Sequence, residues 1–359
     1  MKKIVLTGGG TAGHVTPNIA LLPALQAAGY EIAYVGSYEG IEKKLIADFN
    51  IPYTGISTGK FRRYLDPKNF SDPFRVMKGF VEARNYLKNY QPDVVFSKGG
   101  FVSVPVVRAA ASLHIPCIIH ESDMTPGLAN KLCIPVAEKV CCNFPETMKN
   151  IPADKAVLTG SPIRAELAQG SRLAGLNMCG FTANKPVIMV IGGSLGAANV
   201  NKAVRDALPK LLEDLQVVHL CGKDKIDNLL LNTPGYKQFE YIKAELKDIF
   251  AMADVVISRA GANAICELLA LKKPNILIPL PAASSRGDQL LNAASFEAQG
   301  YSIVLNEDDI TTNLLVDKVH ELYFNRQNYV EAMSRSHQMD AINTIMLLIN
   351  EAANKSHTQ

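Results

Sequence analysis

Three glycine-rich segments have the residue types and the spacing of turns that hold a phosphate group. They are residues 8–13, 97–103 and 192–197, and each follows a short apolar run. The backbone N–H groups of such a turn, together with the N-terminus of the helix that follows, form a site for an anion. One such turn is common wherever a strand meets a helix, but three in one chain favour diphosphate-bearing ligands on both halves of the chain.

The first turn also satisfies the G-x-G-x-x-G pattern of dinucleotide-binding proteins. A nicotinamide-dependent oxidoreductase places an acidic residue at the end of its second strand, where it binds the ribose hydroxyls. In this chain Val35 is followed by Gly36 and Ser37, and Glu39 comes only later. The sequence therefore disfavours a nicotinamide cofactor.

One titratable side chain, that of His14, follows the first turn directly. An imidazole titrates near neutral pH, so at the mouth of the turn it can take a proton from a substrate or contact a phosphate. A histidine that only caps the helix or faces solvent is the alternative interpretation.

The elements that would position these turns are predicted from alternating strand-like and helix-like stretches. This alternation predicts parallel sheets covered by helices. A buried strand that runs into glycines and then a helix begins at Ile4 and again at Ile188, so each half is expected to start its own Rossmann-like sheet. The predicted strands are residues 4–7, 32–35, 94–97, 117–120, 187–191, 217–221, 255–258 and 276–279.

A chain of 359 residues exceeds what one hydrophobic core usually holds, so two domains are expected. We predict an N-terminal domain over residues 1–162 and a C-terminal domain over residues 163–328. A C-terminal helix at about residues 329–353 is expected to pack back onto the first domain.

Composition excludes several classes of protein. The seven cysteines form no C-x-x-C pair, which disfavours a disulfide framework or a zinc site. A net charge of +3 is too small to indicate nucleic-acid binding. No signal peptide and no window of ~18 apolar residues is present, so we expect a protein of the cytoplasm without a transmembrane helix.

The basic residues of the chain are concentrated between Lys60 and Lys88. This segment holds eight Lys or Arg against three Asp or Glu, interleaved with aromatic residues. Such a mixture is typical of a segment at an anionic membrane surface. The alternative is a helix that packs Phe74, Met77 and Val81 inward and leaves its basic residues in solvent.

Seven segments taken together resemble the MurG family, the N-acetylglucosaminyltransferases of peptidoglycan synthesis. They are residues 7–15, 99–103, 120–123, 160–164, 192–197, 259–262 and 288–293, and they follow the family's order over the whole chain. The resemblance implies an α/β protein of the GT-B glycosyltransferase type, with two Rossmann-like lobes facing across a cleft.

The resemblance also implies the reaction. GlcNAc would pass from UDP-GlcNAc to the 4-hydroxyl of the muramyl sugar on undecaprenyl-diphosphate (lipid I), with inversion, giving lipid II at the cytoplasmic face of the membrane. A related transferase that glycosylates a diacylglycerol is the alternative enzyme. A UDP-sugar sensor without catalytic activity is the alternative from another functional class.

Donor contacts follow from the resemblance. It implies that Ser194 and Arg164 approach the UDP diphosphate, that the backbone of Ile242 meets uracil, that Glu267 accepts from the ribose hydroxyls and that Gln289 binds the sugar hydroxyls. Each side chain suits its role, because a guanidinium bonds phosphate and a carboxylate accepts from hydroxyls. Without the family, a surface salt bridge, a solvated helix face and a polar contact between lobes would explain Arg164, Glu267 and Gln289.

The resemblance places substrate contacts of the first lobe at Thr11, Ala12, Gly13 and Asp123. An inverting displacement needs one group to deprotonate the acceptor hydroxyl, and three residues are candidates for it: His14, Glu121 and Asp123. We favour His14. No D-x-D pair is present to hold a metal ion, and neither a metal nor a cofactor is expected. We expect Ser194, Arg164 and the N-terminus of the helix after the third turn to offset the negative charge of the diphosphate.

Overall fold

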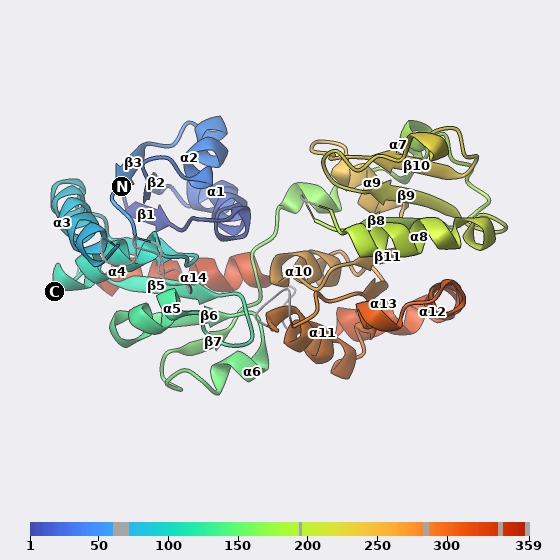
Figure 1. Ribbon diagram of the computed structural model, residues 1–359. Helices are drawn as coiled ribbons and strands as arrows, with labels where there is room; N and C mark the ends of the chain where they lie inside the picture. Colours follow the sequence, from blue (N-terminus) through green and yellow to red (C-terminus); the bar gives the residue numbers. More distant parts are fainter. Residues whose placement is uncertain (60–71, 194–195, 283–286, 337–339, 356–359) are drawn as a thin grey trace. The chain divides into compact units, whose positions relative to one another are not determined.

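The computed structural model describes residues 1–59, 72–193, 196–282, 287–336 and 340–355. The chain forms two compact units (Figure 1). The first contains residues 1–164 and the chain from Asp340 onward, and the second contains Ala165–Met339. The sequence predicted the corresponding boundaries at residues 162 and 328.

The first unit is built on a parallel sheet of seven strands, in which every neighbouring pair runs in the same direction. Its buried strands are rich in β-branched residues, as expected where both faces are covered. In spatial order the strands are β3 (Tyr53–Ile56), β2 (Glu31–Ser37), β1 (Lys3–Thr7), β4 (Val94–Ser97), β5 (Cys117–Glu121), β6 (Lys139–Cys142) and β7 (Ala156–Leu158).

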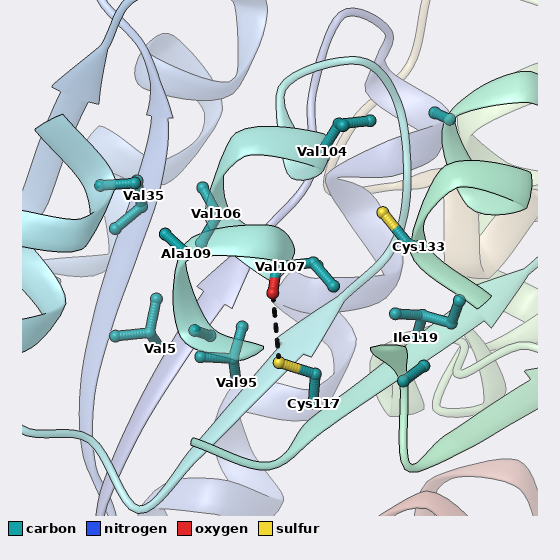
Figure 2. Packing of buried hydrophobic residues seen from close by; sticks show 14 of the residues in the cluster. Val5, Val35, Val95, Val104, Val106, Val107, Ala109, Cys117, Ile119 and Cys133 are labelled. Atoms are coloured by element: carbon teal, nitrogen blue, oxygen red, sulfur yellow. Dashed lines mark hydrogen bonds between the residues drawn. The ribbon is translucent and has the colours of Figure 1, made fainter. Parts of the chain in front are cut away.

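Alternation along the strands divides the core of the first unit into two clusters, because successive side chains point to opposite faces. Val5 and Val95 belong to one cluster, and Ile4 and Phe96 belong to the other. Helices α3 (Asp72–Tyr90), α4 (Ser103–Ser112) and α5 (Leu128–Cys133) supply the first cluster. Figure 2 shows valines of α4 packed against the strand residues of this cluster. Helices α1 (Thr16–Ala27), α2 (Ile41–Ile46) and α14 (Ala341–Lys355) supply the second cluster.

The end of the chain forms two helices, where the sequence predicted one over residues 329–353. α13 (Arg326–Ser334) belongs to the second unit, and α14 belongs to the first. The hydroxyl of Ser334 donates to the carbonyl of Val330 at 2.7 Å. A serine that bonds the backbone in this way slightly weakens a helix, and Ser334 is the last residue of α13.

α14 nevertheless packs on the first unit, against α1, β4 and β5 (Figure 1). The side chains of Ile345 and Ile349 are fully buried in its core. The hydroxyl of Tyr30 donates to Oδ1 of Asn350 at 2.8 Å, which fixes the register of the helix on the sheet.

The second unit repeats the design with a parallel sheet of six strands. In spatial order these are β10 (Tyr236–Phe239), β9 (Gln216–Leu220), β8 (Val187–Ile191), β11 (Val255–Ser258), β12 (Asn275–Leu277) and β13 (Ser302–Val304). The α-helices of this unit besides α13 are α7 (Arg172–Cys179), α8 (Ala198–Leu211), α9 (Leu246–Met252), α10 (Ala262–Ala270), α11 (Asp288–Ala298) and α12 (Thr312–Phe324). Helices α8 and α12 close one core with β8, β9, β11 and β12.

Several short elements lie in the described part of the chain. They are helix α6 (Pro145–Met148) and the 3-10 helices η1 (Ala12–His14), η2 (Ala47–Phe49), η4 (Ile134–Val136), η5 (Ala165–Ala168), η6 (Asn228–Leu230) and η7 (Glu307–Asp309). All seven cysteines are buried thiols. Within the part of the chain that the structure describes, no helix combines the length and the apolar character needed to cross a bilayer.

Candidate active site

Two glycine-rich turns of the first unit meet where β1 and β4 end. The N–H of Gly9 points at the carbonyl of Gly99 with an N···O distance of 3.4 Å. Gly100 has φ +82°, and a Cβ atom there would lie 2.3 Å from the carbonyl oxygen of Gly9 and 3.2 Å from Nδ1 of His14. Only glycine fits so close an approach. The two turns and the imidazole therefore form one cluster at the carboxyl edge of the sheet, where ligands of open α/β sheets bind.

His14 ends the short helix η1, which also contains Ala12 and Gly13 and follows Thr11. Oγ1 of Thr11 lies 3.0 Å from Nδ1 of His14. If Nδ1 carries the proton and donates it to this hydroxyl, Nε2 is the basic nitrogen of the ring. The geometry therefore suits the imidazole as a proton acceptor, and the hydroxyl of Thr11 as the group that orients it.

A buried carboxylate supports this turn, and the sequence did not reveal it. Glu42 is fully buried. Its carboxylate accepts from the N–H of Gly10 at 3.2 Å and from the N–H of Ser37 at 2.9 Å, and it also contacts the hydroxyl of Ser37. Burial and the nearby Glu42 carboxylate raise the pKa of Tyr53. Because Glu42 lies 32 residues from Gly10, no local pattern could identify the contact.

The carboxylate of Glu121, the alternative base, is hydrogen-bonded to the segment that follows β5. Its carboxylate accepts from the N–H of Asp123 at 3.0 Å, from the N–H of Gly127 at 3.0 Å and from Nδ2 of Asn130 at 2.8 Å. The residue is 4% exposed. A carboxylate with three internal donors serves the shape of this loop. Asp123 is half-buried on the same loop, so it stays closer to solvent than Glu121 does.

His120 precedes this loop and is fully buried. Its Nε2 lies 2.9 Å from the carbonyl of Gly160, and its Nδ1 lies 2.9 Å from Nζ of Lys98. Burial, together with the charge of Lys98, holds the pKa of His120 well below its ordinary value. The imidazole is therefore neutral and serves as an internal hydrogen-bonding group.

The third glycine-rich turn lies at the end of β8 in the second unit. Ser194, expected at the diphosphate, falls outside the described residues. Gly196 has φ +68°, and a Cβ atom there would lie 2.0 Å from the carbonyl oxygen of Cys221. Helix α8 then begins after Ala197, whose side chain makes no capping hydrogen bond. The first N–H groups of a helix and the positive end of its dipole favour an anion.

Three of the remaining donor candidates lie on segments that follow strands of the second sheet, and the fourth, Arg164, lies in the first unit. Ile242 is buried between β10 and α9, and Glu267 is half-buried on α10. Gln289 is the second residue of α11, and its Oε1 accepts from the N–H of Leu280 at 3.1 Å. Arg164 is half-buried and is the last residue of the first unit.

An ion pair that the sequence did not predict ties α8 to two strand ends. The guanidinium of Arg259 contacts the carboxylate of Glu307 and donates to the carbonyls of Ile278 and Pro279 at 3.0 and 3.2 Å. The same carboxylate accepts from Nδ2 of Asn199 in the first turn of α8. Arg259 belongs to a segment that the sequence singled out, but Glu307 carries no local signal.

The described side chains include no group of three or more His, Cys, Asp or Glu that could hold a metal ion. The start of α8 is the positive end of a helix dipole.

Comparison with known proteins identifies the family. The N-terminal domain of glycosyltransferase family 28 matches residues 4–142, and the C-terminal domain of this family matches residues 187–346. The UDP-N-acetylglucosamine–N-acetylmuramyl-(pentapeptide) pyrophosphoryl-undecaprenol N-acetylglucosamine transferase of Lachnospira eligens is 64% identical over 351 residues, which are 98% of this chain and 99% of the relative. The protein of the same name from Lachnoclostridium phytofermentans has the same identity and coverage.

A solved structure agrees over both units. The crystal structure of Acinetobacter baumannii MurG matches with a TM-score of 0.77 and 29% identity, over 98% of this chain and 100% of that one. The two-domain glycosyltransferase fold predicted from the sequence is thus confirmed. The chain therefore belongs to glycosyltransferase family 28 and, within it, to the MurG family.

Proposed function

We propose that this chain transfers GlcNAc from UDP-GlcNAc to the 4-hydroxyl of the muramyl sugar of lipid I, with inversion, and so forms lipid II in peptidoglycan synthesis. The observation that carries this proposal is the 64% identity, over 98% of the chain, to relatives named for transfer of N-acetylglucosamine to an undecaprenol-linked muramyl peptide. The diacylglycerol alternative has no counterpart among the relatives described above, so the undecaprenol-linked acceptor is preferred.

The second unit is assigned the donor. The start of α8 after Ala197 is assigned to supply N–H groups and a positive dipole end for the diphosphate of UDP-GlcNAc. Glu267 on α10 is assigned the ribose hydroxyls, the backbone of Ile242 the uracil, and Gln289 the sugar hydroxyls. Ser194 and Arg164 complete the assignment as diphosphate contacts.

The first unit is assigned the acceptor, with Asp123 as a contact and His14 as the base. Thr11, Ala12 and Gly13 are its other proposed substrate contacts. Nε2 of His14 takes the proton of the attacking hydroxyl while the oxygen forms a bond to the anomeric carbon from the face opposite UDP. The bond from the anomeric carbon to the diphosphate oxygen breaks at the same time, and UDP leaves with the electron pair. One proton moves to the imidazole and the anomeric configuration inverts.

Helix α3 supports a peripheral position at the membrane. Phe74, Met77 and Val81 are exposed by 78%, 62% and 52%, although the alternative interpretation of the sequence placed them in the core. Ala83 and Leu87 fill the core instead, from the other side of the helix. The exposed apolar stripe is accompanied by exposed basic residues, which is the composition of an interfacial helix. They are Arg75, Lys78, Arg84 and Lys88.

We propose that this stripe contacts anionic lipids at the cytoplasmic face of the membrane, where a lipid-linked acceptor is presented. The basic segment predicted from the sequence began at Lys60, and residues 60–71 lie outside the described part of the chain. The argument for membrane contact therefore depends on α3.

Competition between substrates tests the proposed function. Purified protein is incubated with equal concentrations of UDP-GlcNAc and UDP-glucose, together with lipid I and a diacylglycerol in mixed micelles. The product expected is lipid I enlarged by one N-acetylhexosamine, identified by mass spectrometry. Glucosylated lipid I would refute the assigned donor, and a glycosylated diacylglycerol would refute the assigned acceptor.

A further inference from the structure

Lys98 is a buried cation that none of the roles assigned above uses. It follows β4 directly and is 1% exposed. Its Nζ lies 2.9 Å from Nδ1 of His120 and contacts the hydroxyl of Ser122. Removing an ammonium group from water is costly unless hydrogen bonds compensate it, and an apolar side chain of the same length would fill this space without that cost. Packing alone therefore does not explain why a lysine occupies this buried position.

The bond between Lys98 and His120 has only one possible direction. A carbonyl cannot donate, so Nε2 of His120 must carry the proton that it shares with the carbonyl of Gly160 at 2.9 Å. Nδ1 is then an acceptor, and an ammonium group is a donor only. Lys98 thus satisfies the one nitrogen of His120 that would otherwise be a buried acceptor, and it fixes the imidazole in its neutral form.

The second contact of Lys98 reaches the loop that carries Asp123. This loop is held from three strands. Lys98 contacts the Ser122 hydroxyl from the end of β4, Nδ2 of Asn143 donates to the carbonyl of Ser122 at 3.0 Å after β6, and Glu121 at the end of β5 accepts from the N–H of Asp123 at 3.0 Å. Of these three anchors, only Lys98 is a cation.

We infer that Lys98 is a positioning residue for the acceptor side of the reaction, acting through His120 and Ser122 to fix the loop of Asp123. This inference rests on the proposed function, because it assigns that loop to the acceptor. Lys98 lies in the first unit with the two turns around His14, whereas every assigned donor contact except Arg164 belongs to the second unit. Loss of Lys98 should therefore impair use of the acceptor selectively.

Two substitutions separate the parts of this role. Lys98→Met keeps the length of the side chain but removes the charge and every N–H donor. Lys98→Gln removes the charge and keeps an amide donor. Lys273→Met is the control, because Lys273 is a half-buried lysine of the second unit whose Nζ donates to the carbonyl of Ala253 at 2.9 Å.

The variants are assayed with a soluble lipid I analogue and UDP-GlcNAc, and their melting temperatures are measured. For Lys98→Met we expect kcat/KM for the acceptor to fall roughly tenfold or more, while KM for UDP-GlcNAc stays within about twofold of the wild type. Lys98→Gln should lie between Lys98→Met and the wild type, and Lys273→Met should retain acceptor kinetics. The ¹⁵N signal of His120 Nδ1 should move in Lys98→Met toward that of a nitrogen without a hydrogen bond.

Two results would overturn the inference. One is wild-type acceptor kinetics in Lys98→Met. The other is a parallel loss of acceptor and donor kinetics together with a large fall in melting temperature, which would make Lys98 a residue of general stability only. Failure of the wild-type protein to glycosylate the lipid I analogue would instead contradict the proposed function, so the two failures are distinguishable.

Discussion

At the scale of single residues, the hydrogen bond between Thr11 and His14 decides whether the imidazole can act as a base. Nε2 is basic only when Nδ1 carries the proton, and the hydroxyl 3.0 Å away can accept it. A base at this position contributes to the chemical step and not to binding of the donor. Activity and donor affinity should therefore respond differently when the imidazole is removed.

We predict that His14→Ala lowers kcat by roughly a hundredfold or more and leaves the affinity for UDP-GlcNAc nearly unchanged. Steady-state kinetics with lipid I and calorimetry with the donor measure the two quantities. His114→Asn is the control, because His114 is exposed and lies in the connection before β5, away from the glycine-rich turns. If His14→Ala retained full turnover, His14 would not be the base, and Asp123 or Glu121 would be the remaining candidates.

The carboxylate of Glu42 stabilises the same turn by accepting from the N–H of Gly10. In Glu42→Gln an amide group replaces one carboxylate oxygen, and its N–H donors then face the N–H groups of Gly10 or Ser37. We expect the free energy of unfolding of the first unit to fall by about 1 to 3 kcal/mol, since a buried donor is left unsatisfied. Urea denaturation measures this change. Glu39→Gln, at an exposed position nearby, should have no effect, and equal stabilities of the two variants would contradict this account.

At the scale of elements, the central strands could be predicted because they are short, apolar and rich in β-branched residues. β4, β8 and β11 have the predicted bounds, and the other predicted strands are present with ends shifted by one or two residues. The strands β3, β6, β7, β10 and β13 were not predicted. The edge strand β3, for example, is only half-buried along most of its length, so it lacks the same apolar signal. The division of the C-terminal stretch between α13 and α14 was also missed.

The site was predictable to the extent that its residues lie in glycine-rich turns. His14 and its neighbours follow directly from the pattern at the end of β1. Lys98, Glu42 and Glu307 could not be assigned roles, because each has at least one partner 22 to 108 residues away, and only the folded sheet brings them together. Sequence spacing therefore locates the turns but not the charged groups that hold them.

The exposed apolar side chains of helix α3 are expected to contribute to membrane binding. Replacing Phe74, Met77 and Val81 with serine should weaken binding to anionic vesicles by roughly tenfold or more, because burying each apolar side chain in the interface contributes on the order of 1 kcal/mol. Vesicle sedimentation measures the binding. The matched control is Leu173→Ser on α7, which removes an exposed apolar side chain of the second unit.

Turnover of a short-chain soluble acceptor should be unaffected in the α3 variant, since only access to embedded acceptor is lost. Vesicle binding equal to that of the wild type would show that the stripe has no part in membrane contact. A further reduction on changing Arg75 and Lys78 to Glu would add the electrostatic contribution, at about 1 kcal/mol for each basic group near the surface.

At the scale of the whole molecule, the two units have separate sheets and separate cores, so donor binding can be impaired without disturbing the first unit. We predict that Glu267→Ala lowers the affinity for UDP roughly tenfold or more, through loss of a charged hydrogen-bond partner, without unfolding the second unit. Titration calorimetry measures the affinity. Glu213→Ala, at an exposed position after α8, should bind UDP normally. Unchanged affinity in Glu267→Ala would remove this residue from the donor site.

The central claim is inverting transfer of GlcNAc to the 4-hydroxyl of the muramyl sugar, and the linkage in the purified product tests it most directly. Wild-type protein is incubated with UDP-GlcNAc, which carries an α-linked sugar, and with a soluble lipid I analogue. Proton and carbon NMR of the disaccharide then report the bond. The account predicts a β-linkage from the anomeric carbon of GlcNAc to the 4-oxygen of the muramyl sugar. An α-linkage, or attachment at any other hydroxyl, would contradict it.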